Sequence, residues 1–246
     1  MRCTDSRPPG PSLYTTATYA CSYLPERVAR SQVAACSPEA TIADYDRLIQ
    51  HGFRRSGHFI YRPHCDACQA CQALRIPVVQ FQPDRSQRRA LKRHAHLIAR
   101  WLPTEFVEEH FALYQRYQCA RHPGGGMDNA DEKAYAEYLL HTPIQTQLVE
   151  FRIPTAQGDL GQLVMVSVID RVADGLSAVY TFFEPDPNAS WGTYNVLWQI
   201  EQARRLQLAY VYLGYWIAES PKMAYKTRFN PHERLVRGRW LPGTSA

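Results

Sequence analysis

The chain has no run of about 18 apolar residues, the length that a membrane-spanning helix needs. Its first residues lack the apolar core of a secretory signal, and we expect residues 1–13 to be a disordered, proline-rich lead-in. A strong excess of one charge sign is missing too, since the net charge is +5 over 246 residues. These absences exclude a membrane-spanning protein and favour a soluble globular protein of the cytoplasm.

Two ligand-binding patterns are also absent. The glycine-rich stretch at residues 121–132 has no preceding strand and no following Lys-Ser or Lys-Thr, so it predicts a flexible connector instead of a phosphate loop. The coenzyme A pattern Q/R-x-x-G-x-G/A does not occur either. Its absence argues against acetyl-CoA as a ligand.

The seven cysteines are an odd number and lack the spacing of a small secreted scaffold, which indicates reduced thiols. Three of them, Cys65, Cys68 and Cys71, form a C-x-x-C-x-x-C run between two short strand-like segments. A tight turn with this spacing can direct two or three sulfurs to one point. It therefore suits a metal, a cluster or a redox pair.

A basic run follows the cysteines. We predict a helix over residues 86–100, with Leu91, Ala95 and Ile98 on its apolar side and no acidic residue opposite. Such a basic face is typical of contacts with nucleic acid phosphates, although a charged face in solvent is the competing interpretation. The basic candidates are Arg85, Arg88, Arg89, Lys92 and Arg93.

The remaining pattern predicts an α+β fold. A helix begins at Thr41, a strand covers residues 59–61, and a partner strand covers 74–78, where Pro77 favours a sheet edge. After the basic run we expect helices at 104–118 and 130–140, strands at 145–153, 161–171 and 176–184, a helix from about Thr193, a strand at 209–217, and a short helix that Ser220 caps. We predict an N-terminal α/β domain with the cysteines at 14–100, a second domain at 101–240, and a tail at 241–246.

The order of elements in the second domain fits an N-acetyltransferase-like (GNAT) domain, a mixed sheet flanked by helices. In that fold two neighbouring strands part and leave a cleft where an acyl donor and an amine meet. We expect Trp191, Gly192 and Thr193 to form the donor loop, at a helix N-terminus whose N–H groups suit an anion or a developing oxyanion. Because the coenzyme A pattern is missing, another acyl carrier is favoured.

Eight motifs together resemble those of a known family. They occupy residues 21–25, 52–57, 61–71, 75–78, 81–89, 177–185, 212–217 and 220–229, so they span nearly the whole chain. The combination resembles the arginyl-tRNA–protein transferases, in particular their bacterial branch, the aspartate/glutamate leucyltransferases. The resemblance implies transfer of leucine from leucyl-tRNA to the N-terminal amine of proteins that begin with Asp or Glu. The added leucine then marks those proteins for degradation.

The chemistry of such a transfer makes few demands. An aminoacyl ester is already activated, so neither ATP nor a cofactor is required. The attacking α-amine has a pKa of about 7.7–8.0, and placement beside the ester with a hydrogen bond to the tetrahedral oxygen supplies most of the acceleration. Tyr180, Tyr212 and Tyr215 lie on strands beside the expected cleft and are the candidates to move a proton. The competing interpretation is core packing, which is usual for tyrosine.

An acidic first residue on the acceptor requires a basic partner. The candidates are Arg54 and Arg55 in the 52–57 turn, and Lys226 and Arg228 after the last apolar strand. A solvated surface charge is the competing interpretation for each. The match to the family motif favours the two arginines.

The cysteines allow two interpretations. Cys21 with Cys65, Cys68 and Cys71 would supply four thiolates for zinc or an iron–sulfur cluster, and the resemblance implies a metal or cluster site because eukaryotic family members carry N-terminal cysteines of this kind. This chain departs from that pattern, since Leu24 and Pro25 stand where a second cysteine would follow. Reduced thiols that pack a small subdomain are the other interpretation.

Three other functions remain open. The first is transfer of another aminoacyl group, such as arginine, from tRNA. The second is a non-catalytic, thiol-bearing protein that binds nucleic acid or senses redox state, which leaves the GNAT-like half without a role. The third is an ordinary coenzyme A N-acyltransferase, which the missing donor pattern disfavours.

Overall fold

The computed structural model describes residues 10–37, 41–122 and 131–243. Its largest element is an eight-stranded mixed sheet of β7 (Gln72–Pro77), β8 (Ile98–Leu102), β9 (Thr146–Pro154), β10 (Leu160–Val172), β11 (Gly175–Phe183), β12 (Tyr210–Trp216), β13 (Glu233–Val236) and β14 (Arg239–Pro242). The strand order is β14-β13-β7-β12-β11-β10-β9-β8. Strands β11 and β12 are parallel, and the other neighbours are antiparallel.

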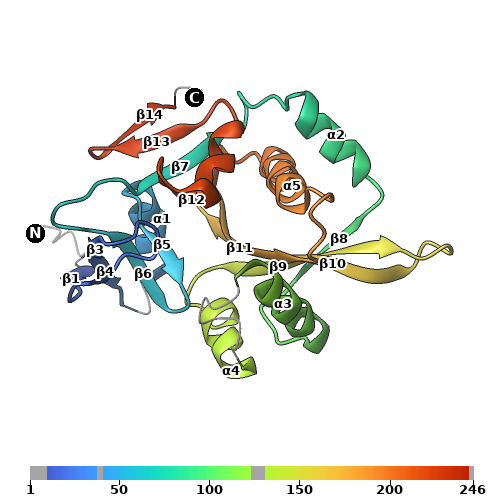
Figure 1. The fold of residues 1–246 in the computed structure, drawn as a ribbon, viewed down its shortest axis with the longest axis horizontal. Coiled ribbons are helices and arrows are strands. Elements are labelled where there is room, and N and C mark those ends of the chain that lie inside the picture. Colours follow the sequence, from blue (N-terminus) through green and yellow to red (C-terminus); the bar gives the residue numbers. More distant parts are fainter. Residues whose placement is uncertain (1–9, 38–40, 123–130, 244–246) are drawn as a thin grey trace, which may run out of the picture.

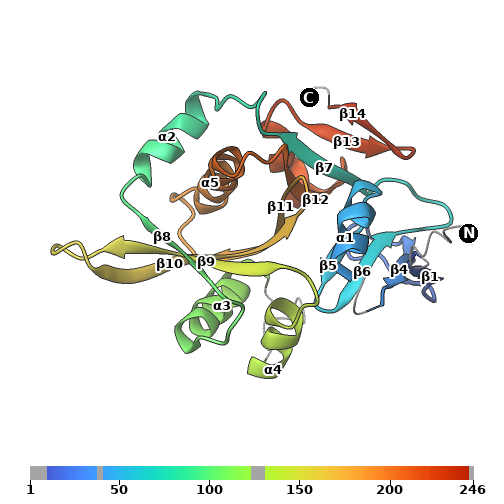
Figure 2. The ribbon, with the colours of Figure 1, turned by 180° about the vertical axis from the view of Figure 1, so that it is seen from behind.

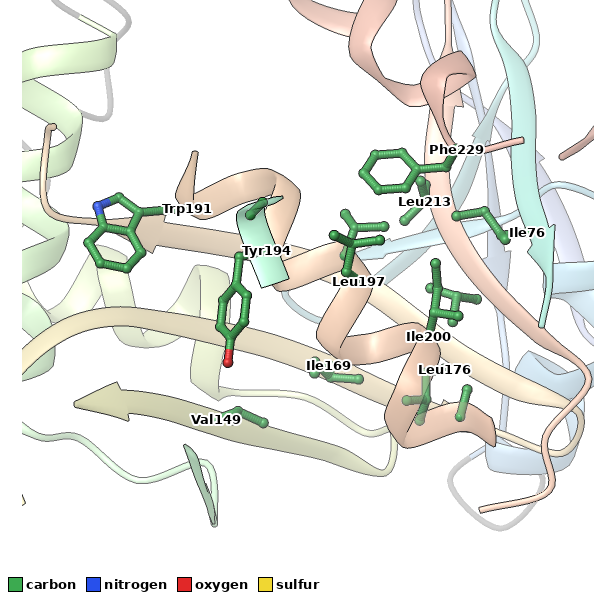
Figure 3. Close-up of a cluster of buried hydrophobic side chains, with 14 of the residues drawn as sticks. Ile76, Val149, Ile169, Leu176, Trp191, Tyr194, Leu197, Ile200, Leu213 and Phe229 are labelled. Carbon is green, nitrogen blue, oxygen red and sulfur yellow. The ribbon is translucent and has the colours of Figure 1, made fainter. Parts of the chain in front are cut away.

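Helices cover both faces of this sheet. Helix α5 (Trp191–Arg205) lies on one face, while α3 (Glu108–Arg121), α4 (Glu132–Tyr135) and the π-helical turn η1 (Ala136–Leu140) lie on the other (Figure 1). Leu197 and Ile200 of α5 pack in one core with Ile169 of β10 (Figure 3). Val166 and Val168 of β10 belong to the core under α3 instead. Burial on both faces explains why residues 163–169 of β10 are apolar except for Ser167, as the sequence predicts for a central strand.

A second, smaller sheet holds the N-terminal residues. Its strands are β1 (Ser12–Thr15), β4 (Ser31–Ala35), β5 (Arg54–Ser56) and β6 (Phe59–Pro63), in the order β1-β4-β6-β5, and a short hairpin pairs β2 (Tyr19–Ala20) with β3 (Val28–Ala29). Helix α1 (Thr41–Gln50) lies between this sheet and the large one (Figure 2). Its Tyr45 and Ile49 join the two sheets, since they share a core with Ile60 and Tyr212.

Strand β7 corrects an expectation. The sequence pattern predicts an edge strand because of Pro77, but β7 lies between β12 and β13. Residues 233–242 form the β13–β14 hairpin beside β7, which the sequence does not signal. Pro77 is tolerated because it ends the strand, beyond the pairing of Arg75 with Glu233.

The helix predicted over residues 86–100 is wrong in length. Helix α2 (Arg85–Arg93) starts with a capping box between Asp84 and Gln87, ends at His94, and is followed by β8. Residues 98–102 pair with β9 as an edge strand of the sheet. This pairing determines their structure, although their apolar spacing is helical. Gln87 and Ala90 are the buried positions of α2, whereas Ala95 is exposed and Ile98 belongs to β8.

Other boundaries differ by smaller amounts. The helix expected from 104 begins at Glu108. The helix after Ser220 is the 3₁₀-helix η2 (Pro221–Arg228), and the Ser220 side chain makes no cap bond. Of the predicted glycine-rich loop, residues 123–130 lie outside the described residues.

The ends of the chain also differ from expectation. Residues 1–9 of the predicted lead-in lie outside the described residues, but Ser12 and Leu13 form part of β1. Of the predicted tail, Leu241 and Pro242 belong to β14, and 244–246 are not described. Strands β7 and β8 come from the predicted N-terminal domain, yet they share the sheet with β9–β12, and the division at residue 100 stays a prediction. None of the described helices is long and apolar enough to span a bilayer.

Candidate active site

The two parallel strands at the centre of the large sheet diverge. Residues 175–177 of β11 pair with residues 210–212 of β12, and beyond that point the strands no longer bond to each other although both continue. This is the parting of neighbouring strands expected of a GNAT-like domain, and the α+β, GNAT-like class is confirmed. A cavity of about 180 Å³ lies at the divergence, between Ser177, Ala178 and Val179 of β11 and Leu213, Gly214 and Tyr215 of β12.

The other walls of this cavity come from the N-terminal part of the chain and from two later segments. These lining residues are Tyr23, Arg54, Arg55, Ser56 and Tyr61, then Tyr138 of η1, and Met223 and Lys226 of η2. A larger hollow of about 310 Å³, lined by Trp101, Leu176 and Leu206 among others, contains none of the predicted site residues. The smaller cavity, which several predicted site residues line, is therefore the candidate active site.

Arg54 is buried in this cavity without an ionic partner. It is 6% exposed, and its Nη1 donates to the carbonyl of Phe53 at 2.8 Å. Its Nε and Nη2 are buried and have no hydrogen-bond partner among the described residues. The guanidinium lies 5.3 Å from the ring centre of Tyr212 and 6.0 Å from that of Tyr215. Aromatic faces attract a cation but do not satisfy its N–H groups.

Lys226 is the second cation at the cavity. Its Nζ donates to the backbone carbonyl of Tyr215 at 2.6 Å. Burial, together with the charge of Arg54, lowers the pKa of Lys226 to about 8. No described carboxylate forms an ion pair with either residue. The cavity therefore has an excess of positive charge.

Arg55 lines the same cavity, but its donors are already engaged. Its Nε and Nη2 hold the carboxylate of Asp170 in β10, and Nη1 donates to the carbonyl of Gly57 at 3.3 Å. Arg228, the fourth predicted cation, is exposed and is not part of the cavity lining. The structure thus brings Arg54, Arg55 and Lys226 together and leaves Arg228 outside.

Of the three predicted tyrosines, Tyr215 lines the cavity. Its hydroxyl donates to the carbonyl of Gly52 at 2.8 Å, and burial raises its pKa well above the ordinary value. Tyr212 lies deeper, where its hydroxyl is bonded to Asp174, and Tyr180 bonds Gln118. Burial raises the pKa of both. All three phenols therefore stay protonated near neutral pH, which suits hydrogen-bond donors better than bases.

Sequence reasoning missed three wall tyrosines: Tyr23, Tyr61 and Tyr138. Tyr23 and Tyr61 stand within motifs that carry the family resemblance, so the signal was present. Tyr138 has no such signal, because it reaches the cavity only through the packing of η1, whose carbonyl at Tyr138 accepts from the amide of Gly57.

The predicted donor-loop residues Trp191, Gly192 and Thr193 form the first turn of α5, which begins two residues before the expected Thr193. Trp191 is buried, and Gly192 and Thr193 are half-buried. The preceding residue, Ser190, has a φ of +57°, in the left-handed region that non-glycine residues seldom adopt. The N-terminus of α5 follows the end of β11, so the loop leads from the diverging strands to the N–H groups of the helix.

His94 connects the donor loop to helix α2. It terminates α2, is 3% exposed, and bonds the carbonyl of Ala189 through Nε2. Its ring lies 4.2 Å from that of Trp191, centre to centre. Beside it, Nη1 of Arg93 donates to the carbonyl of Asn188. No sequence signal pointed to His94, because the predicted helix continued past it.

The five predicted tRNA-binding residues are all exposed on α2. None of Arg85, Arg88, Arg89, Lys92 and Arg93 forms an ion pair with a described carboxylate. Arg88 and Arg93 donate to backbone carbonyls, of Pro83 and Asn188. The helix thus presents an uncompensated basic surface.

The cysteines gather loosely beside the cavity. Burial and the nearby Cys65, Cys21 and Cys68 raise the pKa of Cys71 to about 12. Among the described residues, no group of three or more His, Cys, Asp or Glu side chains is arranged to hold a metal ion. The Cys68 sulfur accepts from Arg27 at 3.5 Å instead. The four-thiolate site therefore stays a prediction, and we derive no step through a metal.

Two family models match the sequence. The family model described as "Arginine-tRNA-protein transferase, N terminus" matches residues 19–89, and the one described as "Arginine-tRNA-protein transferase, C terminus" matches residues 109–236. The chain belongs to the arginine-tRNA-protein transferase family. Members of this family are aminoacyltransferases, and the resemblance expected from the motifs is confirmed.

Curated relatives within the arginine-tRNA-protein transferase family share about half of their residues with the chain. The aspartate/glutamate leucyltransferase of Chromobacterium violaceum is 53% identical over 228 residues, which is 92% of both chains. That of Thiobacillus denitrificans is 54% identical over 92% of both chains, and that of Nitrosospira multiformis is 52% identical over 92% of this chain and 88% of its own.

Solved structures are more distant. FemX is 8% identical, with a TM-score of 0.48 over 88% of this chain and 84% of that chain. A tandem GNAT protein from the clavulanic acid biosynthesis pathway is 12% identical, with a TM-score of 0.42 over 95% and 65% of the two chains.

Proposed function

We propose that this protein transfers leucine from leucyl-tRNA to the N-terminal amine of proteins that begin with Asp or Glu, and that the leucine marks them for degradation in the cytoplasm. The names of the curated relatives support the leucine donor and the acidic acceptor. The observation that carries the proposal is Arg54, a buried guanidinium with two unpaired nitrogens at the cavity between the diverging strands.

An unpaired buried cation is costly, because it has lost its water and gained no counter-charge. A carboxylate on the first residue of the acceptor would supply that charge, and a guanidinium can hold it with two parallel hydrogen bonds. Lys226 adds a second positive charge beside Arg54. An amide such as Asn or Gln has the shape of Asp or Glu but not the charge, so the same cations would leave it poorly bound.

The positive charge also helps the nucleophile. With one carboxylate bound, the cations of Arg54 and Lys226 disfavour a further positive charge, so the α-amine of the acceptor is held neutral. The amine nitrogen attacks the ester carbon of leucyl-tRNA, the new C–N bond forms, and the C–O bond to the terminal ribose breaks. One amine proton leaves and the ribose oxygen takes up one. No cofactor is needed, since the ester is already activated.

The tRNA is proposed to bind along α2 and the donor loop. The uncompensated basic surface of α2 suits phosphates. The N-terminus of α5, at Gly192 and Thr193, suits the phosphate nearest the aminoacyl end of the donor. His94 joins the two, so the body of the tRNA and its aminoacyl end are proposed to meet one connected surface.

Transfer assays with purified protein test the proposal. Leucyl-tRNA and arginyl-tRNA, each carrying labelled amino acid, are incubated with peptides that differ only in residue one: Asp, Glu, Asn, Gln or Ala. We expect label from leucyl-tRNA on the Asp and Glu peptides only. Equal transfer to all five peptides would contradict the acidic acceptor, and transfer from arginyl-tRNA alone would contradict the leucine donor.

A further inference from the structure

A row of side chains leads from the outer edge of the N-terminal sheet to Arg54. The residues paired directly across β1, β4, β6 and β5 are Tyr14, Val33, Tyr61 and Arg54. Directly paired residues of antiparallel strands project from the same face, so the four side chains form one line. Their exposure falls along it: Tyr14 is 62% exposed, Val33 and Tyr61 are half-buried, and Arg54 is 6% exposed.

Two more aromatic residues widen this line. Phe59 is 65% exposed and lies two residues before Tyr61, hence on the same face of β6. The hydroxyl of Tyr19 bonds the hydroxyl of Ser31 at 2.6 Å, and Ser31 lies two residues before Val33 on β4. We call Tyr14, Tyr19, Val33, Phe59 and Tyr61 the aromatic lane.

The opposite face of the same sheet is used by the core. Leu13, Ala34 and Ile60 form the neighbouring row there, and Ala34 and Ile60 are buried beneath α1. No described helix covers the aromatic lane in this way, and the inner end of the lane enters the cavity at Tyr61. The lane is therefore an exposed apolar surface that continues directly into the proposed acceptor site.

We propose that the aromatic lane binds the acceptor polypeptide, over the residues that follow its acidic first residue. The inference rests on the proposed function, since it takes residue one to be held at Arg54. An acceptor whose first side chain lies at Arg54 must leave the cavity past one of its walls. Tyr61 is the wall that opens onto an apolar surface, which suits an extended chain with apolar side chains.

The length of the lane sets how much of the acceptor it contacts. Three strand spacings separate β5 from β1, about 14 Å at about 4.8 Å each. An extended chain advances about 3.3 Å per residue, so about four residues cover that distance. Residue one at Arg54 then places residue five near Tyr14. The lane residues carry no charge, so apolar side chains at positions two to five should be preferred over Gly, Asp or Lys.

Acceptor peptides of graded length and composition test this. The set is an Asp-Gly amide, Asp followed by four glycines, and Asp followed by alternating leucine and glycine over four residues. We expect the leucine-containing peptide to have a KM about tenfold below that of the glycine peptide. The Asp-Gly amide is too short to reach β1 and serves as the reference.

Two variants of one strand supply matched controls. Tyr14→Ser removes the outer end of the lane, whereas Leu13→Ser changes its neighbour on the opposite face, which is 46% exposed. We expect Tyr14→Ser to raise the KM of the leucine-containing peptide toward that of the glycine peptide. Leu13→Ser should leave the preference intact, and thermal unfolding of both variants shows whether β1 still folds.

The outcomes separate this inference from the proposed function. If the Asp-Gly amide and the longer peptides all fail to accept leucine, the proposed function is wrong. If all of them accept leucine with the same KM, only the lane is wrong. A Tyr14→Ser protein whose oligomeric state changes while its peptide preference stays would assign the lane to a self-interface and overturn the inference.

Discussion

Arg55 and Asp170 form an ion pair inside the protein, at 3.0 Å, with both side chains fully buried. Tyr45 and Thr146 also bond the same carboxylate, at 3.2 and 2.6 Å. The preceding residue, Arg54, points to the other face of the short strand β5 and has no carboxylate. One of two adjacent arginines thus stabilises the fold, and the other is left with donors for a ligand.

Loss of Arg54 should therefore impair acceptor binding. We expect Arg54→Ala to lower kcat/KM for a Glu-initiated peptide by about 30-fold, since a charge-assisted pair contributes about 2 kcal/mol. Arg54→Lys should recover only part of this, because an ammonium cannot make the parallel pair of bonds. The affinity for leucyl-tRNA, measured by filter binding, should change less than twofold. A fall in tRNA affinity instead would place Arg54 at the donor.

Loss of Arg55 should unfold the protein more readily. Arg55→Met leaves the carboxylate of Asp170 buried without a counter-charge, which costs about 3–5 kcal/mol of unfolding free energy. Arg205→Met is the control, because its pair with Glu201 is exposed and contributes less than about 1 kcal/mol. Urea unfolding followed by circular dichroism measures both. Equal midpoints for the two variants would show that the buried pair does not stabilise the fold.

The contrast between these two arginines marks a limit of the sequence. The 52–57 motif predicted that both matter, and both lie at the cavity. It could not distinguish them, because Asp170 is 115 residues away and meets Arg55 only once β5 and β10 are placed together. The largely apolar stretch of β10 and the helix α1 were predictable, since each depends on a local pattern of residues.

The ends of elements were less predictable. Helix α2 stops at His94 because the following residues pair with β9, and no local pattern reveals that partner. The β13–β14 hairpin has the same origin: it is held by Arg75 of β7, whose guanidinium bonds Glu233 at 2.7 Å and lies 4.2 Å from the ring of Trp240. Pairing with distant strands determines both the end of α2 and the β13–β14 hairpin. A short segment of sequence does not predict such pairing.

Lys226 should make stability depend on pH. Its pKa is lowered to about 8 in the folded protein, and an unfolded chain has an ordinary value of about 10.4. At pH values between these two pKa values the unfolded state binds more protons than the folded state. The contribution of Lys226 therefore increases the free energy of unfolding as pH rises from about 8 to about 10. Lys226→Met should remove that gain, whereas Lys222→Met, at an exposed position of the same helix, should keep it. Urea titrations at pH 7.5 and 9.5 compare the three proteins, and identical pH slopes would rule out a lowered pKa for Lys226.

The basic surface of α2 should carry the salt dependence of tRNA binding. Replacement of Arg88, Arg89 and Lys92 by Gln removes three charges and keeps helix propensity. Each lost phosphate contact reduces the magnitude of the slope of log K against log salt by roughly 0.7–0.9. For the triple variant, the magnitude of this slope should therefore be smaller by about two to three. Uncharged tRNA should respond as leucyl-tRNA does, and peptide KM should stay constant. A double variant with Arg204 and Arg205 replaced by Gln is the control, because it removes two charges that already pair with Glu201. An unchanged slope in the α2 variant would move the tRNA surface elsewhere.

His94 should position the donor loop and not bind the tRNA itself. Ser190 holds a left-handed conformation that is unfavourable for serine, and such a residue persists only where its surroundings fix it. The bond from His94 to Ala189 and the contact with Trp191 provide that support. His94→Phe keeps a ring against Trp191 but loses the N–H donor, and we expect kcat with leucyl-tRNA to fall about tenfold because the loop no longer aligns the ester.

Three measurements separate this positioning role from a general loss of structure. The affinity of His94→Phe for uncharged tRNA should stay within twofold of the unsubstituted protein, because the phosphate contacts on α2 are intact. His94→Gln should recover part of kcat, since its amide can still donate to the Ala189 carbonyl. His96→Phe, an exposed neighbour 6.5 Å away between ring centres, should behave as the unsubstituted protein does. If His94→Phe loses both tRNA affinity and thermal stability, and His94→Gln does not recover kcat, then His94 only packs against its neighbours and does not position the loop.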